Sequence, residues 1–101
     1  MLMSFVSAQP FELTTAAGEL TGIGSAMAAQ NAAAAPATTG VIPAAADPVS
    51  ALTAAQFVAH AGLYQAVSAQ ANAVHQMFVT TLATSAAAYE ATEAANAIAA
   101  R

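Results

Sequence analysis

The chain contains no cysteine, no tryptophan and no lysine, and its single basic residue is Arg101. Without cysteine it can form no disulfide, thiolate nucleophile or Cys-ligated metal site, although the redox compartment stays open. One basic residue leaves no positive footprint for phosphate backbones, which argues against a nucleic-acid partner. Attraction to anionic membrane surfaces is equally unsupported.

Charge of either sign is scarce, since 6% of the residues are charged, against about 25% in a typical soluble domain. The formal net charge of −4 comes from Glu12, Glu19, Asp47, Glu90 and Glu93. About a third of the residues are alanine, which favours helix strongly but buries little apolar area. The composition predicts one helical domain over residues 1–101 with a small core.

Long apolar runs are also missing. No stretch of about 18 leucine-class residues occurs, so we expect no transmembrane segment. The start of the chain has no basic region followed by an apolar run, so we expect no standard cleavable signal peptide. An exported protein of this kind needs another signal.

Proline and glycine divide the chain into two helices. Pro36, Gly40 and Pro43 predict a loop over about 36–47, after a first helix over about 10–35. Asp47 before Pro48 predicts an N-cap and first helical residue, opening a second helix over about 48–85. Residues of about 86–101 are left as a tail.

The first helix carries a narrow apolar seam. Leu13, Leu20 and Met27 recur every seven residues with Ile23 between them, as expected for a helical bundle. On another side, the glycine pair Gly18 and Gly22 predicts close approach of another backbone.

The second helix has an apolar face about 160° wide, more than the ~100° that one neighbouring helix covers. It is also longer, about 57 Å against about 39 Å, so it should overhang the first helix at Met77, Phe78 and Leu82. Residues 1–9 could shield part of this overhang with Phe5 and Val6. We therefore predict an all-α, antiparallel two-helix hairpin that needs further helices from a partner to complete a four-helix bundle.

The opposite side of the second helix is more polar. It includes Val58, Gln65 and Asn72. The expected partner interface consists of the large apolar residues of both helices: Leu13, Leu20, Ile23, Met27, Leu52, Phe57, Leu63, Tyr64, Val67, Val74, Met77, Phe78 and Leu82.

Nothing in the sequence indicates catalysis, a cofactor or a metal site. Fifteen helical residues place His60 and His75 about 22 Å apart, too far to share a metal. Four polar residues lie within or beside the apolar stripe of the second helix, namely Thr53, Gln56, His60 and Gln70. They either fix register and partner choice or face solvent at the edge of the seam.

Tyr89 and Glu93 are four residues apart near the end of the chain. On a continuing helix they would share one face and present an aromatic ring beside a carboxylate.

Several stretches along the chain resemble the PE family of mycobacterial proteins. They are Met3-Ser4-Phe5-Val6, Gln30-Asn31-Ala32-Ala33-Ala34-Ala35, Thr38-Thr39-Gly40-Val41-Ile42-Pro43, Phe57 with His60, Tyr64-Gln65-Ala66-Val67 and Tyr89-Glu90-Ala91-Thr92-Glu93. One departure occurs near the start, where Pro10 is followed by Phe11 and the acid stands at Glu12, rather than directly after proline as in the family's name.

The resemblance implies a heterodimer with a PPE protein, held in the cytosol by an EspG-type chaperone that contacts the PPE partner. It further implies export through a type VII secretion system to the cell surface or medium, with Tyr89 and Glu93 matching the family's Y-x-x-x-D/E signal. The middle segment is most similar to PE proteins associated with ESX-5. Because the chain ends at Arg101, we expect a PE domain without an added enzyme.

A second hypothesis uses the same apolar face without a PPE partner. The chain would then be a surface-active amphipathic protein that binds lipid or pairs with itself as a homodimeric four-helix bundle.

Overall fold

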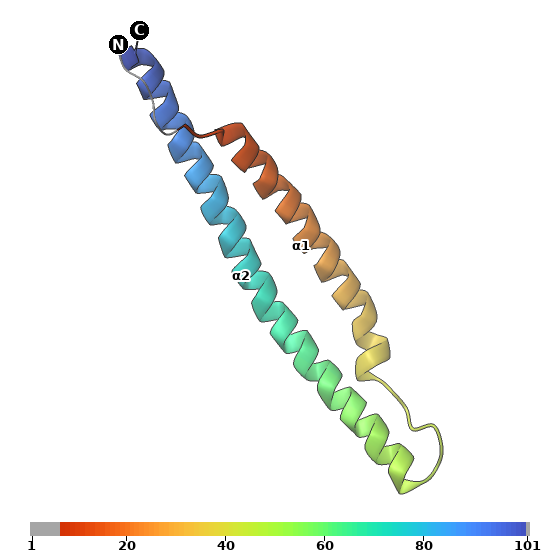
Figure 1. Cartoon of the computed structure of the whole chain (residues 1–101). Coiled ribbons are helices and arrows are strands. Elements are labelled where there is room, and N and C mark those ends of the chain that lie inside the picture. The colour runs from red at the N-terminus through yellow and green to blue at the C-terminus, as the bar shows by residue number, and fades with distance from the viewer. Residues whose placement is uncertain (1–6, 101) are drawn as a thin grey trace. The chain divides into compact units, whose positions relative to one another are not determined.

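The computed structural model describes residues 7–100, which form two long α-helices joined by a loop (Figure 1). Helix α1 spans Pro10–Thr39 and α2 spans Pro48–Ala100. No strand occurs within this described range. The all-α class and the two-helix hairpin predicted from the sequence are confirmed.

Both helices begin at the residues that the sequence predicts. Asp47 caps α2, because its carboxylate accepts hydrogen bonds from the Ser50 main-chain N–H at 3.0 Å and the Ser50 hydroxyl at 2.7 Å. These bonds hold the pKa of Asp47 below its ordinary value, the hydroxyl bond being the main cause. At the start of α1, the Gln9 carbonyl oxygen accepts from the main-chain N–H groups of Glu12 and Leu13.

Helix α1 ends four residues later than predicted, and Pro36 lies inside it. A proline removes only its own N–H donor, so a single helical hydrogen bond is lost near the end of an alanine-rich helix. The Thr38 and Thr39 hydroxyls donate to main-chain oxygens in this last turn. At Gly40 a β-carbon would lie 2.8 Å from the Pro36 main-chain oxygen, which is too close. Glycine has no β-carbon, so the chain can pass close to this oxygen where the helix ends.

Helix α2 continues fifteen residues beyond the predicted end at residue 85. The tail predicted over 86–101 is therefore helical as far as Ala100. Residues 86–100 contain no proline or glycine and are mostly alanine, so intrinsic propensity favours continued helix. A run of polar and charged residues around Glu90 was mistaken for the end of the helix.

The chain divides into two compact units. The loop unit is Gly24–Val74 and contains the end of α1, the connecting loop and the first half of α2. The terminal unit contains residues up to Ile23 and those from His75 onward. Within each unit, a segment of α1 packs against a segment of α2 that runs in the opposite direction (Figure 1).

In the loop unit, α2 starts farther out than α1 ends. The Tyr64 hydroxyl donates to the Asn31 side-chain oxygen at 2.8 Å, which places these residues opposite each other. Counting from that pair in an antiparallel arrangement, Thr39 at the end of α1 is level with about residue 56, so the first turns of α2 extend about 12 Å beyond α1. Residues 40–47 span this distance (Figure 1).

This offset corrects the predicted overhang. In the terminal unit, the His75 ring nitrogen Nε2 lies 2.7 Å from the Leu20 carbonyl oxygen, so Pro10 is level with about residue 85. Met77, Phe78 and Leu82 therefore lie beside α1 and not beyond it. The part of α2 that does extend past the start of α1 begins at about residue 86. Phe5 and Val6, expected to shield the overhang, lie outside the described residues.

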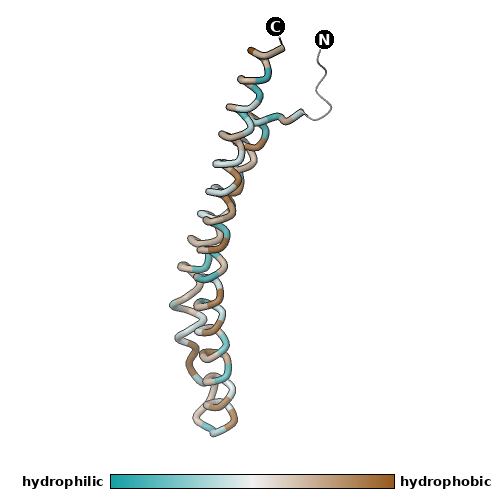
Figure 2. Tube along the Cα trace, turned by 90° about the vertical axis from the view of Figure 1, so that its left-hand side faces the viewer, coloured by the Kyte–Doolittle hydropathy of each residue, from teal (hydrophilic) through white to brown (hydrophobic). Residues whose placement is uncertain are grey.

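The buried core consists of alanines alone: Ala17, Ala54, Ala61 and Ala86. No large side chain is fully buried anywhere in the part of the chain that the structure describes. Apolar segments instead recur along both helices, as the brown stretches of Figure 2 show. Because burial of alanine removes little apolar area from water, the contact between α1 and α2 supplies little hydrophobic stabilisation by itself.

Candidate partner-binding surface

Helix α2 packs against α1 through small and polar residues. In the loop unit, Ala54 and Ala61 are buried, and Val58, Gln65 and Asn72 are half-buried. With the half-buried Ser68 between Gln65 and Asn72, these residues follow one another at spacings of three and four, which places them on one side of the helix. The sequence analysis had assigned Val58, Gln65 and Asn72 to the polar side opposite the apolar face, without recognising that α1 covers that side.

The same pattern continues in the terminal unit. His75, Val79 and Leu82 are half-buried, and Ala86 is buried with 2% of its surface exposed. We call this side of α2, in each unit, the seam. The spacing of the seam residues is that of a narrow bundle contact, but most of them are too small or too polar to form a substantial core.

Large apolar side chains of the loop unit lie outside the seam and are exposed. We call them the open apolar surface: Val49, Leu52, Phe57, Leu63, Tyr64, Val67 and Val74, exposed by 48–73%. Phe57, Tyr64, Val67 and Val74 recur at spacings of seven and three, so they share one side of α2. A contiguous apolar patch of this kind is typical of an interaction surface.

Other residues of the predicted interface divide into two groups. Ile23 and Met27 on α1 are exposed by 57% and 55%, and Met77 and Phe78 on α2 by 69% and 56%. Three more predicted residues, Leu13, Leu20 and Leu82, are half-buried within the terminal unit.

Gly18 and Gly22 were expected to allow close approach of another backbone. A β-carbon built at either glycine meets no atom within 4 Å outside its own stretch of α1, so no other segment among residues 7–100 approaches them. Both glycines are exposed and accessible to a second molecule.

Charge is almost absent from the loop unit. Its one residue with a formal charge is Asp47, at the end of the loop. Between Pro48 and Tyr89, α2 has no Asp, Glu, Lys or Arg. Soluble surfaces normally contain about 25–35% charged residues. The loop unit supplies almost none, so few charged side chains surround the open apolar surface and favour its exposure to water.

Polar contacts between the helices come from Tyr64, Gln65 and His75, none of which was predicted to contact α1. The Gln65 amide nitrogen donates to the Asn31 main-chain oxygen at 3.0 Å, next to the bond between Tyr64 and Asn31. His75 makes the corresponding contact to Leu20 in the terminal unit. Asn72 follows Gln65 by seven residues, and His75 follows Asn72 by three. This helical spacing of polar residues could have indicated a polar seam.

The four polar residues singled out from the sequence, Thr53, Gln56, His60 and Gln70, are exposed. Thr53 donates its hydroxyl to the Val49 main-chain oxygen at 2.8 Å and so bonds within its own helix. The choice between partner recognition and solvent contact therefore stays open for these residues. Within residues 7–100, no group of three His, Cys, Asp or Glu side chains could hold a metal ion.

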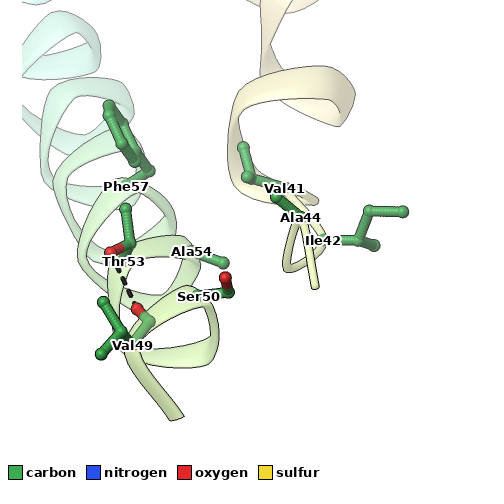
Figure 3. A pocket seen from close by; sticks show the side chains of 8 residues that line it. All are labelled: Val41, Ile42, Ala44, Val49, Ser50, Thr53, Ala54 and Phe57. Carbon is green, nitrogen blue, oxygen red and sulfur yellow. Dashed lines mark hydrogen bonds between the residues drawn. The ribbon is translucent and has the colours of Figure 1, made fainter. Parts of the chain in front are cut away.

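An open hollow lies where the loop meets the start of α2 (Figure 3). Val41 and Ile42 of the loop line one side, opposite Val49, Thr53 and Phe57 of α2. The Thr53 and Ser50 hydroxyls that border it are already bonded to main-chain or carboxylate oxygens. The hollow is thus apolar and suits an apolar side chain more than a polar ligand.

Tyr89 and Glu93 lie on the part of α2 that extends past the start of α1. They continue the seam spacing, since Tyr89 is seven residues after Leu82 and Glu93 is seven after Ala86. Tyr89 is 49% exposed and Glu93 is half-buried. The two residues therefore lie on the same side of α2 as the seam. They come after the residues of α2 that α1 covers, so α1 does not reach them.

Neither helix, over the described range, is long and apolar enough at once to cross a bilayer. A family model described as the PE family matches residues 6–96, nearly the whole chain. The chain belongs to the PE family. The resemblance inferred from the sequence is thereby confirmed.

This PE chain is similar to several proteins of Mycobacterium tuberculosis. It is 62% identical over 98 residues to PE family protein PE13 of strain ATCC 25618 / H37Rv, covering 97% of this chain and 99% of that protein. It is 58% identical to PE family protein PE8 of the same strain, covering 97% of this chain but 36% of that protein. It is 53% identical to PE-PGRS family protein PE_PGRS33 of strain CDC 1551 / Oshkosh, covering 94% of this chain and 20% of that protein.

The PE chain thus spans nearly the full length of the first relative but only a minor part of the length of the other two. None of these three names indicates an enzymatic activity.

Proposed function

We propose that this PE chain is a non-enzymatic interaction module that forms a heterodimer with a PPE protein. Helices of the PPE protein would cover the open apolar surface and complete a four-helix bundle. Residues 1–101 would act as one PE domain in that complex, in agreement with the family match over residues 6–96.

The observation that carries this proposal is the distribution of side chains on α2. Alanine and polar residues face α1, whereas Phe57, Leu63 and Val67 are about three-fifths exposed. Burial of such side chains contributes about 1.5–3 kcal/mol each. A partner helix would gain this stabilisation, and α1 does not provide it.

Export is the second part of the proposal. The complex would be held in the cytoplasm by an EspG-type chaperone bound to the PPE partner, then leave through a type VII secretion system of the ESX-5 type. Tyr89 and Glu93 would form the export signal, and their position on the extension of α2 supports this role because α1 leaves that level free. The protein would then reach the cell surface or the medium.

Co-expression with PPE proteins of M. tuberculosis, one at a time, tests the proposal. The chain carries an affinity tag, and complexes are sized by light scattering after chromatography. We expect poor solubility of the chain alone and a stable one-to-one complex with at least one PPE protein.

Three outcomes would contradict the heterodimer. A monodisperse monomer with cooperative thermal unfolding would show that the hairpin is self-sufficient. A stable homodimer that no PPE protein displaces would favour a four-helix bundle of two copies. Flotation with lipid vesicles would favour the surface-active alternative, since the open apolar surface could also enter a lipid interface.

A further inference from the structure

Tyr64 takes part in two surfaces at once. Its hydroxyl donates to the Asn31 side-chain oxygen on α1 at 2.8 Å, within the loop unit. Its ring belongs to the open apolar surface, and 48% of the residue is exposed. The contact between the two helices is therefore linked, through one side chain, to the surface that faces away from α1.

Asn31 is itself held in place. Its main-chain oxygen accepts a hydrogen bond from the Gln65 amide at 3.0 Å, and both residues are half-buried. Tyr64 and Gln65 are consecutive on α2, so two adjacent side chains reach the same residue of α1. The acceptor for the Tyr64 hydroxyl thus has a defined position relative to α2.

We propose that Asn31 is a positioning residue, which fixes the Tyr64 ring on the open apolar surface before the partner binds. This inference rests on the proposed heterodimer. The Tyr64 hydroxyl gives its one proton to Asn31, so the partner needs to provide no acceptor there. The partner surface opposite Tyr64 is an apolar helical face that packs against the ring.

The surroundings of the ring agree with an apolar contact. Phe57 precedes Tyr64 by one heptad and Val67 follows it by three residues, and both are exposed on the same side of α2. An aromatic ring that is ordered before binding loses less conformational entropy when the complex forms. Loss of the Asn31 acceptor would therefore weaken binding without removing any atom of the contact itself.

Asn31→Ala and Tyr64→Phe test this role in a double-mutant cycle. Alanine at residue 31 keeps the main-chain oxygen that Gln65 binds, so the variant removes only the acceptor for Tyr64. The measurement is the Kd for the PPE protein that forms the one-to-one complex in co-expression, from dissociation of the co-purified complex on dilution. We expect each single variant to bind about five- to tenfold more weakly, and the double variant no more weakly than either one.

Two further variants separate positioning from general packing. Asn31→Asp keeps a side-chain oxygen as acceptor and should restore most of the affinity. Gln30→Ala, an exposed neighbour on α1, is the matched control and should bind as the wild type does. Circular dichroism of each variant checks that its helix content is retained.

The outcomes distinguish this inference from the proposed function. If the wild-type chain binds no PPE protein, the proposed heterodimer is wrong. If the wild type binds but both single variants bind equally well, Asn31 does not position Tyr64. Additive losses in the double variant would mean that Asn31 contacts the partner directly, which also overturns the inference. Should Asn31→Ala lose helix content, Tyr64→Phe and Asn31→Asp still decide the question.

Discussion

Phe78 lies along the length of α1 and yet stays largely exposed. It lies within the length of α2 that runs along α1, yet it is 56% exposed, because the seam residues Val79 and Leu82 face α1 instead. Its ring is therefore available to a partner. The helix lengths had suggested that Phe78 lies on an overhang beyond α1, which is not the reason for its exposure.

Phe78→Ala should weaken the complex with the PPE partner by about 2–4 kcal/mol, because a ring buried between helices is replaced by a methyl group. Dissociation of the co-purified complex on dilution measures this change. Phe11→Ala is the matched control, since Phe11 is 78% exposed at the start of α1 and is not part of the predicted interface. Equal binding by the wild type and Phe78→Ala would remove this residue from the interface.

Asp47 makes the start of α2 sensitive to acid. Its folded pKa lies below the ordinary value of 3.8 because the Ser50 hydroxyl and N–H bind the ionised carboxylate. As the pH falls, the unfolded chain takes up this proton first. The stabilisation from the cap is complete above that value and is lost as the pH falls through the folded pKa.

Asp47→Asn keeps an oxygen that can cap the helix but does not titrate, whereas Asp47→Ala removes the cap. Near neutral pH we expect the thermal midpoint of the complex with the PPE partner to fall clearly in Asp47→Ala and less in Asp47→Asn. Circular dichroism at about pH 6 and about pH 3 should show a smaller pH dependence for Asp47→Asn than for the wild type. Identical pH dependence in the two proteins would assign the acid sensitivity to other carboxylates.

At the scale of the helices, the seam depends on residues that are small. Ala61 is 8% exposed, so a larger side chain there must push α1 and α2 apart. Ala61→Leu should destabilise the protein by about 1–3 kcal/mol, because overpacking forces the backbone to shift. Urea unfolding of the complex with the PPE partner measures this change, with Ala59→Leu on the exposed side of α2 as control. If both variants unfold at the same urea concentration, a leucine side chain fits between the helices at residue 61 without overpacking.

The extension of α2 allows export to be tested separately from pairing. Tyr89→Ala and Glu93→Ala should leave the complex with the PPE partner intact, because both residues lie past the start of α1 and outside the predicted interface. Each variant should be retained in the cells, as measured by immunoblotting of cell and medium fractions. Glu90→Ala, an exposed acid between them, serves as control and should be exported. Normal export of all three variants would mean that Tyr89 and Glu93 have no signal function.

The sequence predicted the elements better than their ends and contacts. Asp47 with Pro48 located the start of α2 because capping is a local interaction. Pro36 was misleading, since a proline near a helix end costs only one hydrogen bond and the surrounding alanines favour helix.

The side of α2 that meets α1 could not be found from hydrophobicity. A seam of alanine, glutamine and asparagine has no strong apolar period, so Val58, Gln65 and Asn72 were assigned to the polar side. The large apolar residues were predicted to form a face too wide for one helix, and the structure leaves those of the loop unit exposed.

For the molecule as a whole, the placement of charge predicts how binding responds to salt. Four of the five acids, Glu12, Glu19, Glu90 and Glu93, lie in the terminal unit, and the open apolar surface has none. Screening by salt acts on charges, whereas apolar burial is not weakened by it.

The Kd of the complex with the PPE partner should therefore change less than about threefold between about 0.05 and about 0.5 M sodium chloride. Dissociation of the co-purified complex on dilution, at several salt concentrations, measures this response. A tenfold weakening in high salt would instead place the acids of the terminal unit within the interface.

The alanine core also determines how the amount of this protein in a cell would be controlled. Because the contact between α1 and α2 buries little apolar area, the proposed heterodimer would derive most of its folding free energy from the partner, and the folded fraction would rise with partner concentration by mass action. Copies made in excess of the partner would stay partly unfolded and be degraded by proteases. The cell could thus match the numbers of the two chains without a regulator of expression, since a hairpin with an incomplete core survives only in the complex that completes it.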